Sequence, residues 1–195
     1  MRKTRILIEC ETYVQTAIET YNSFKLFEQY GHIEVIMKLT REITKEDIKW
    51  CDILYSIRSE NLLSTYFAQV CTQCGRFHIV LLDDNLFIQQ RTDYFMRKRQ
   101  SELGKIMNIT NVLIVSNDLL GRKIVSEYKV SRYVRMDTAV DKNEIHQLKK
   151  NTVNNHKRMV YYSNDGSNNY FNTVMLPILD KYTKETNENC EVHCI

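Results

Sequence analysis

The sequence contains little proline, little glycine and no long apolar run. One proline and five glycines occur among its 195 residues, which excludes collagen-like repeats and low-complexity linker as its main material. No apolar stretch approaches the roughly 18 residues that a membrane-spanning helix needs. The basic and then apolar start "MRKTRILIECE" reaches Glu9 and Glu11 too soon for a secretory signal, so we expect a cytoplasmic protein.

Two glycine-rich motifs of nucleotide-binding proteins are also missing. No G-x-G-x-x-G follows the first apolar run, and no G-x-x-x-x-G-K-[ST] occurs anywhere. These absences argue against a dinucleotide dehydrogenase and against a P-loop nucleotidase. One glycine-containing loop, "SNDGSNN", does follow an apolar run and precedes a helical pattern. Its backbone amides could bind a donor phosphate through Asn164, Gly166 and Ser167, although "NDG" is also an ordinary turn.

Six cysteines are present, including the pairs in "CTQC" and "CEVHC". Their spacings match no zinc finger or zinc ribbon. Cys71 and Cys74 lie late in an expected helix, whereas a redox-active pair lies where a strand meets a helix N-terminus. We therefore expect reduced, partly buried thiols and no metal site.

Positive charge is concentrated in one segment of the chain. The formal net charge is +3, and the segment from Arg91 to Arg135 has ten Lys or Arg against four acids. Such an excess suits a phosphate-bearing ligand or an anionic membrane surface, and it is also typical of a solvated helix face. The segment lacks interleaved aromatic residues and a helix-turn-helix pattern, so we expect no nucleic-acid partner.

Short apolar runs alternate with helical stripes along the chain. One such stripe, Leu63, Phe67, Val70 and Cys74, ends at Gly75, a residue that commonly terminates helices. The expected strands are "ILIEC", "HIEVIMKL", "DILYSIR", "FHIVLL", "NVLIVS" and "RYVRM". Near-continuous apolar strands that alternate with helices are typical of a buried parallel sheet. The sequence therefore predicts an α/β fold, a Rossmann-like parallel sheet with helices on both faces.

A polar segment divides the chain in two. Residues 1–140 form the predicted first domain, and the asparagine-rich residues 141–157 form a linker. From residue 158 to 195 the pattern restarts with "RMVYYS", a helical stripe that Pro177 should kink, and "CEVHCI". One strand, one helix and one strand bury too little apolar surface to make a domain. We expect this part to be the first β-α-β of a second, incomplete Rossmann-like domain.

Polar residues follow the expected strands. In open parallel sheets, ligands bind in the crevice beyond the carboxyl ends of the strands. The candidate binding residues at these ends are Arg58, Glu60, Asp83, Asp84 and Asn85. Turn chemistry accounts for the Asp83–Asn85 cluster equally well, and helix capping is the favoured role of Asn61, Ser116 and Asn117.

The order of elements resembles the N-terminal domain of GT-B-fold glycosyltransferases, a family that includes the bacterial group-1 enzymes. "YGHIEVI" resembles the family's entry into its second strand, and "HIVLLDDNLF" resembles a strand that ends in an acidic loop. "VRMDTAVD" is similar to the turn at the junction of the two domains. "KRMVYYSNDGSNNYFNTVMLPILDKY" looks like the opening of the C-terminal domain.

This resemblance implies two Rossmann-like domains that face each other across a cleft. Residues 1–140 would bind a glycan or lipid-linked acceptor, with Arg58, Glu60 and the Asp83–Asn85 cluster facing its hydroxyls. The second domain would bind a nucleotide-sugar, which is a co-substrate, and no cofactor is implied. The segment from Arg91 to Arg135 would contact an anionic lipid or membrane, which makes the protein membrane-peripheral.

The resemblance also implies that sugar transfer needs more than these residues. The family's pair of donor-binding glutamates lies deeper in the C-terminal domain and is not found in this sequence. We therefore expect a glycosyltransferase portion that is inactive without the rest of its donor domain. The alternative is a non-catalytic α/β binding module, or one subunit of a split glycosyltransferase.

Overall fold

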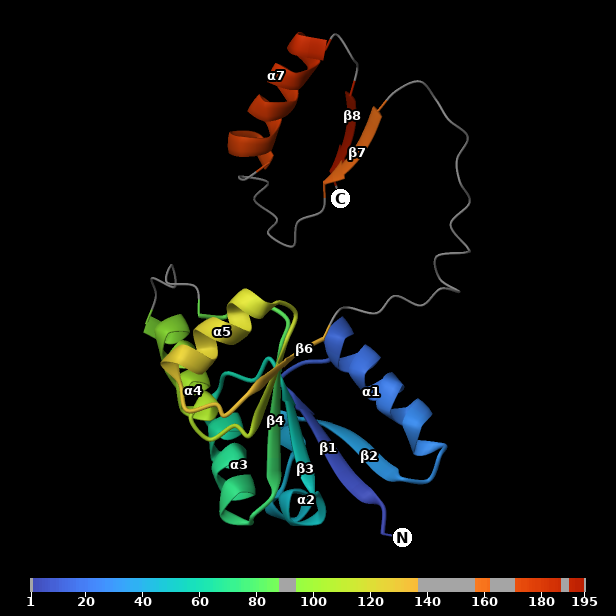
Figure 1. The fold of residues 1–195 in the computed structure, drawn as a ribbon, viewed down its shortest axis with the longest axis vertical. Coiled ribbons are helices and arrows are strands. Elements are labelled where there is room, and N and C mark those ends of the chain that lie inside the picture. Colours follow the sequence, from blue (N-terminus) through green and yellow to red (C-terminus); the bar gives the residue numbers. More distant parts are fainter. Residues whose placement is uncertain (1, 88–93, 137–156, 162–170, 187–189, 195) are drawn as a thin grey trace. The chain divides into compact units, whose positions relative to one another are not determined.

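In the computed structural model, residues 2–87, 94–136, 157–161, 171–186 and 190–194 are described (Figure 1). The chain divides into two compact units, residues 1–139 and 140–195. Within the described ranges, each helix is too short or too polar to cross a membrane.

The first unit contains a six-stranded parallel sheet in the order β2-β1-β3-β4-β5-β6. Its strands are β1 (Thr4–Cys10), β2 (Ile33–Leu39), β3 (Ile53–Ile57), β4 (Phe77–Leu82), β5 (Val112–Val115) and β6 (Tyr133–Arg135). In the register of the sheet, Ile8 lies beside Met37 of β2 and Tyr55 of β3. Because all strands run the same way, their carboxyl ends meet at one edge, which we call the carboxyl edge.

Helices cover both faces of this sheet. They are α1 (Gln15–Glu28), α2 (Lys45–Trp50), α3 (Leu62–Gln73), α4 (Tyr94–Met107) and α5 (Asp118–Glu127). The crossover from β1 to β2 runs in the opposite direction to the later ones, so right-handed connections place α1 on one face and α2 to α5 on the other. Figure 1 shows this division, with α1 to the right of the sheet and α3, α4 and α5 to its left. The predicted Rossmann-like α/β fold is confirmed.

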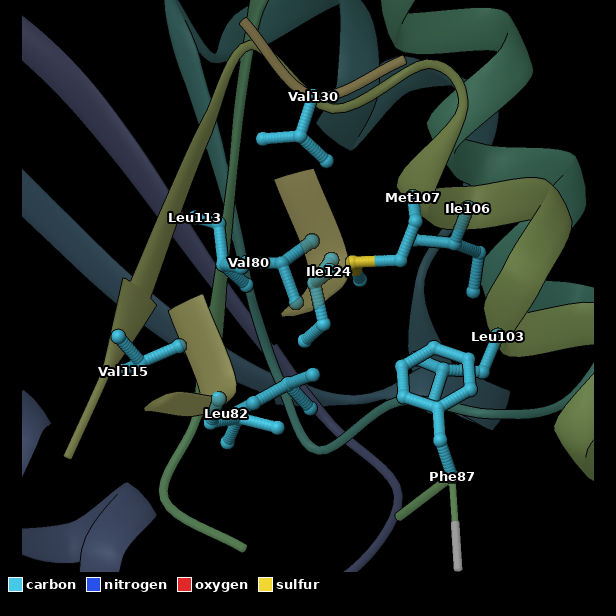
Figure 2. Packing of buried hydrophobic residues seen from close by; sticks show 11 residues of the cluster. Val80, Leu82, Phe87, Leu103, Ile106, Met107, Leu113, Val115, Ile124 and Val130 are labelled. Carbon is cyan, nitrogen blue, oxygen red and sulfur yellow. The ribbon is translucent and has the colours of Figure 1, made fainter. Parts of the chain in front are cut away.

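Side-chain alternation along the strands divides the core between the two faces. On the α1 face, Ile8 and Tyr55 pack in one cluster with Ala17. On the other face, Leu7 and Leu54 pack with side chains of α2 and α3. A further cluster lies beneath α4 and α5, and Figure 2 shows side chains of β4 and β5 on one side of it and side chains of α4 on the other.

Short-range signals in the sequence set the ends of several helices. The side-chain oxygens of Thr44, Asn61 and Asn117 each accept a hydrogen bond from a backbone N–H in the first turn that follows. Gly75 ends α3 in the left-handed region, with φ of +64°. Ser116 does not cap α5 as predicted, because its hydroxyl instead donates to the carbonyl of Asp83 at 2.8 Å.

The second unit contains β7 (Lys157–Tyr161) and β8 (Cys190–Cys194), which pair in parallel. A π-helical turn, Phe171–Met175, leads into α7 (Leu176–Thr186) between them. Pro177 has no N–H to donate to the preceding turn, so its effect is this widened turn before the α-helix. The β-α-β arrangement matches the predicted start of a second Rossmann-like domain. Of the predicted linker 141–157, only Lys157 lies within the described residues.

Candidate functional site

The strand order identifies the point on the carboxyl edge where a ligand site is expected. The order reverses direction between the neighbouring strands β1 and β3. Open parallel sheets bind ligands outside the carboxyl ends of the strands at such a switch point. β1 ends at Cys10 and β3 ends at Ile57, so Glu11 and Arg58 are the first residues beyond the sheet there.

Arg58 connects this switch point to the acidic loop after β4. Its backbone N–H donates to the carbonyl of Leu81 at 3.1 Å, so the β3–β4 pairing extends to this residue. Its φ of +52° then breaks the alternation of the strand, in a region that residues with a β-carbon rarely adopt. The guanidinium Nε lies 3.1 Å from Oδ1 of Asp83, and Nη2 pairs with Oδ2 of Asp84. Three of the predicted site residues thus form one cluster.

Asp83 is the central member of the cluster. Its Oδ2 accepts a hydrogen bond of 2.7 Å from Oγ1 of Thr16 on α1, and its carbonyl accepts the bond from Ser116 after β5. It therefore joins α1 to the ends of β3, β4 and β5. The side chain of Asp83 is 29% exposed and that of Asp84 is 61% exposed. Asp84 is the carboxylate with more of its surface open to a ligand.

A second ion cluster lies on the other side of the switch point. Arg99 of α4 donates to Glu11 at 2.7 Å and to Glu60 at 3.0 Å. The backbone N–H of Glu60 also donates to Glu11 at 2.7 Å. Burial lowers the pKa of Arg99, but its bonds to the two carboxylates outweigh this effect and raise the pKa overall. Arg99 therefore stays charged and holds α4 against the switch point.

Glu60 was predicted to face the acceptor. In the structure it is buried and holds Arg99 in place. It is 6% exposed, and its carboxylate is engaged with Arg99. Asn85 is exposed, and its Oδ1 accepts from the N–H of Phe87 at 3.2 Å, which is turn chemistry. The predicted donor-phosphate residues Asn164, Gly166 and Ser167 lie outside the described residues.

Glu9 lies beneath both clusters, in a buried supporting role that the sequence did not predict. It points from β1 into the interior, is fully buried, and accepts hydrogen bonds from three hydroxyls. The donors are Thr40 at 2.6 Å, Ser64 at 2.5 Å and Ser59 at 2.8 Å. Because Ser59 follows Arg58, this network holds the backbone that directs the Arg58 guanidinium. A single carboxylate within the apolar run "ILIEC" is the sequence signal, since a buried charge needs several hydrogen-bond donors.

The carboxyl edge is acidic overall. Beside the switch point it carries the carboxylates of Glu11, Glu60, Asp83 and Asp84 and the guanidiniums of Arg58 and Arg99. At the ends of β5 and β6, Asp118 and Arg135 form a further pair at 3.8 Å. This excess of carboxylates over guanidiniums favours a neutral, hydroxyl-bearing or cationic group over an anion. The basic segment predicted from the sequence contributes Arg99 and Arg135 to this edge. Its Lys105 lies in the last turn of α4, where it pairs with Glu102 at 2.7 Å. Its predicted contact with an anionic membrane stays a prediction.

The cysteines of the first unit are free thiols. Cys10, Cys51 and Cys71 are buried, and Cys74 is exposed at the end of α3. Burial raises the pKa of Cys10 to about 11 and that of Cys71 to about 12. These two thiols therefore stay protonated, and protonated thiols are poor nucleophiles and poor metal ligands. Over the described ranges, no group of three or more His, Cys, Asp or Glu side chains is placed to hold a metal ion.

A scan of the sequence against protein-family models finds no match, and a search of the curated proteins finds none either. The structure defines the class of fold, an open parallel α/β sheet with a polar cluster at its switch point. A functional assignment for this chain therefore depends on that cluster and on the motif resemblance.

Proposed function

We propose that the first unit is the acceptor-binding domain of a GT-B-type glycosyltransferase and that the unit containing β7 and β8 begins the donor domain. The observation that carries this proposal is the Arg58–Asp83–Asp84 cluster beside the switch point between β1 and β3. The reaction is transfer of a sugar from a nucleotide-sugar to an acceptor hydroxyl in glycan or glycolipid synthesis. The nucleotide-sugar is a co-substrate, and the proposal requires no further cofactor.

In this proposal the cluster positions the acceptor hydroxyl. Asp84 has the more exposed carboxylate and accepts a hydrogen bond from that hydroxyl. Asp83 is a positioning residue, since Thr16 and Arg58 contact its two carboxylate oxygens. Arg58 pairs with both acids, and its single positive charge offsets part of their repulsion. Orientation of a reacting hydroxyl is a large part of the catalytic effect in group transfer, so a supporting carboxylate matters as much as the one that touches substrate.

One observation favours a second candidate, the non-catalytic binding module or split subunit. The guanidiniums of Arg58 and Arg99 are already paired with carboxylates, which suits a surface that binds hydroxyl-rich ligands without reaction. Such a module would bind the acceptor as tightly as the transferase does. Transfer activity, rather than acceptor binding, separates the two candidates.

The test is sugar transfer measured by mass spectrometry. The chain is assayed alone and with the rest of a donor domain, supplied as its natural continuation or as a partner chain. A panel of nucleotide-sugars is offered together with glycan and alkyl glycoside acceptors. We expect a glycosylated product only when the donor half is present. Acceptor binding without transfer under every condition would support the binding module instead. No perturbation of the Asp83 and Asp84 amide resonances by any acceptor would overturn both candidates.

A further inference from the structure

A cavity of about 380 Å³ lies on the α1 face of the sheet in the first unit. Its floor is apolar and includes Tyr55 of β3, Leu81 of β4 and Ile114 of β5. One wall is α1, with Phe24 and Thr20 facing the space. The cavity therefore lies beside the helix and directly below the carboxyl edge.

The cavity exists because helix coverage of this face is incomplete. Of the helices that the structure describes in the first unit, α1 alone packs here, and Ala17 and Tyr21 cover the part of the sheet nearest to β1. Further along the sheet, Ile79 of β4 and Ile114 of β5 stay half-buried. Parallel sheets normally have both faces covered, so apolar surface over β4 and β5 favours an occupant.

The polar groups of the cavity lie at one end and belong to the site already described. Asp83 lines the cavity and is also the centre of the cluster with Arg58 and Asp84. Glu19 adds a second carboxylate, and no lysine or arginine is among the lining residues that the structure describes. This charge pattern suits a neutral or cationic polar group joined to an apolar body, and it opposes an anion. The volume falls within the usual range of small-molecule sites.

We propose that this cavity binds the apolar aglycone of the acceptor, an alkyl or aromatic group joined to a neutral, hydroxyl-bearing head. The apolar group lies on Leu81 and Ile114, and the head reaches Asp83 and Asp84 at the carboxyl edge. This inference rests on the proposed acceptor role of the first unit. It adds the chemical class of the acceptor, an uncharged amphiphile rather than a free sugar or a phosphate-headed lipid.

The first experiment measures binding of three probes to the whole chain. The probes are n-octyl β-D-glucoside below its micelle concentration, glucose, and octyl phosphate. Titration calorimetry gives the affinities, and methyl NMR follows Leu81 and Ile114. We expect saturable binding of the octyl glucoside, with shifts at both methyl groups. Its affinity should exceed that of glucose and of octyl phosphate at least about tenfold, a difference of about 1.4 kcal/mol.

A matched pair of variants locates the binding site. Thr20→Trp fills the cavity from α1, whereas Asn22→Trp places the same side chain on an exposed position of α1 outside the lining. Octyl glucoside binding should be lost in Thr20→Trp and kept in Asn22→Trp. Ser23→Trp, one helical turn along the same wall, repeats the test if Thr20→Trp does not fold.

Three results would overturn this inference. They are unchanged binding in both cavity variants, octyl phosphate binding as tight as octyl glucoside binding, and a wild-type dimer that Thr20→Trp dissociates. The last result would assign the cavity to an interface between two copies of the chain. Because these assays need no donor sugar, their failure leaves the transfer test intact. Sugar transfer to acceptors without an apolar group would still support the proposed function.

Discussion

The guanidinium Nε of Arg58 lies 3.1 Å from Oδ1 of Asp83, and Arg58 makes this contact from a left-handed backbone conformation. A residue with a β-carbon is strained there, and such strain persists where surrounding contacts hold it. The contacts are the backbone bond to Leu81, the ion pairs with the acidic loop and the Glu9 network behind Ser59. Backbone strain of this kind is often found at binding sites, which supports the proposed site.

This strain predicts an unusual order of stability for two variants. Arg58→Ala and Arg58→Gly both remove the ion pairs, but only glycine adopts φ of +52° without cost. We expect Arg58→Gly to be more stable than Arg58→Ala by about 1 kcal/mol. Urea unfolding of the two variants measures the difference directly. Equal stability, or a more stable alanine variant, would show that the backbone here is not strained.

The buried network around Glu9 predicts a large effect of a small change. Glu9→Gln keeps the size and shape of the side chain but replaces one carboxylate oxygen by an NH2 group. In the wild type, hydroxyls donate hydrogen bonds to both carboxylate oxygens, and an NH2 group cannot accept them. The free energy of unfolding should fall by about 1–3 kcal/mol. Glu127→Gln, at an exposed position at the end of α5, is the control and should change the free energy of unfolding by less than about 0.5 kcal/mol. Similar losses in both variants would contradict the network's role.

The sequence predicts the elements of this fold well because their signals are local. Apolar runs mark the strands, and Thr44, Asn61 and Asn117 cap the helices that follow them. Ser116 shows the limit of such signals, since its hydroxyl meets Asp83 across the sheet instead of capping its own helix.

The site was predicted less completely because its contacts join distant parts of the chain. The acidic loop and Arg58 were identified, since polar residues at strand ends gather at one edge of a parallel sheet. The partner of Glu60 was not identified from the sequence. It is Arg99 of α4, which also pairs with Glu11 and is far from both acids along the chain. Pairings of this kind depend on how α4 packs, which no local pattern specifies.

His78 predicts a loss of stability in mild acid. It is fully buried, and burial lowers its pKa from 6.5 to about 4. The unfolded chain therefore binds a proton at this residue between these two pH values, whereas the folded chain does not. The free energy of unfolding is therefore unaffected by His78 above pH 6.5. It falls by up to about 3 kcal/mol as the pH is lowered toward 4.

The check is a pH series of urea unfolding for the wild type, His78→Phe and His32→Gln. His78→Phe should flatten the fall in stability between pH 6.5 and 4. His32 is exposed, so His32→Gln should keep the wild-type slope. A wild-type slope in His78→Phe would show that other groups cause the acid sensitivity.

Thiol labelling should separate Cys74 from the other cysteines of the first unit. Cys74 is exposed, whereas Cys51 and Cys71 are buried with pKa values raised to about 11 and about 12. In the native protein we expect rapid alkylation of Cys74 and protection of Cys51 and Cys71 until the chain unfolds. Peptide mass spectrometry after timed labelling reads each site. Rapid native labelling of Cys71 would contradict its buried position.

The central claim is that the Arg58–Asp83–Asp84 cluster positions an acceptor hydroxyl for sugar transfer. The most direct measurement is the kcat/KM for the acceptor of Asp83→Asn/Asp84→Asn, with the donor half present. The control is Glu46→Gln/Glu127→Gln, which removes two exposed charges away from the cluster. We predict a fall of about 100-fold or more in the cluster variant, because a positioned carboxylate typically contributes that much, and no change in the control. Unchanged transfer by the cluster variant would contradict the account.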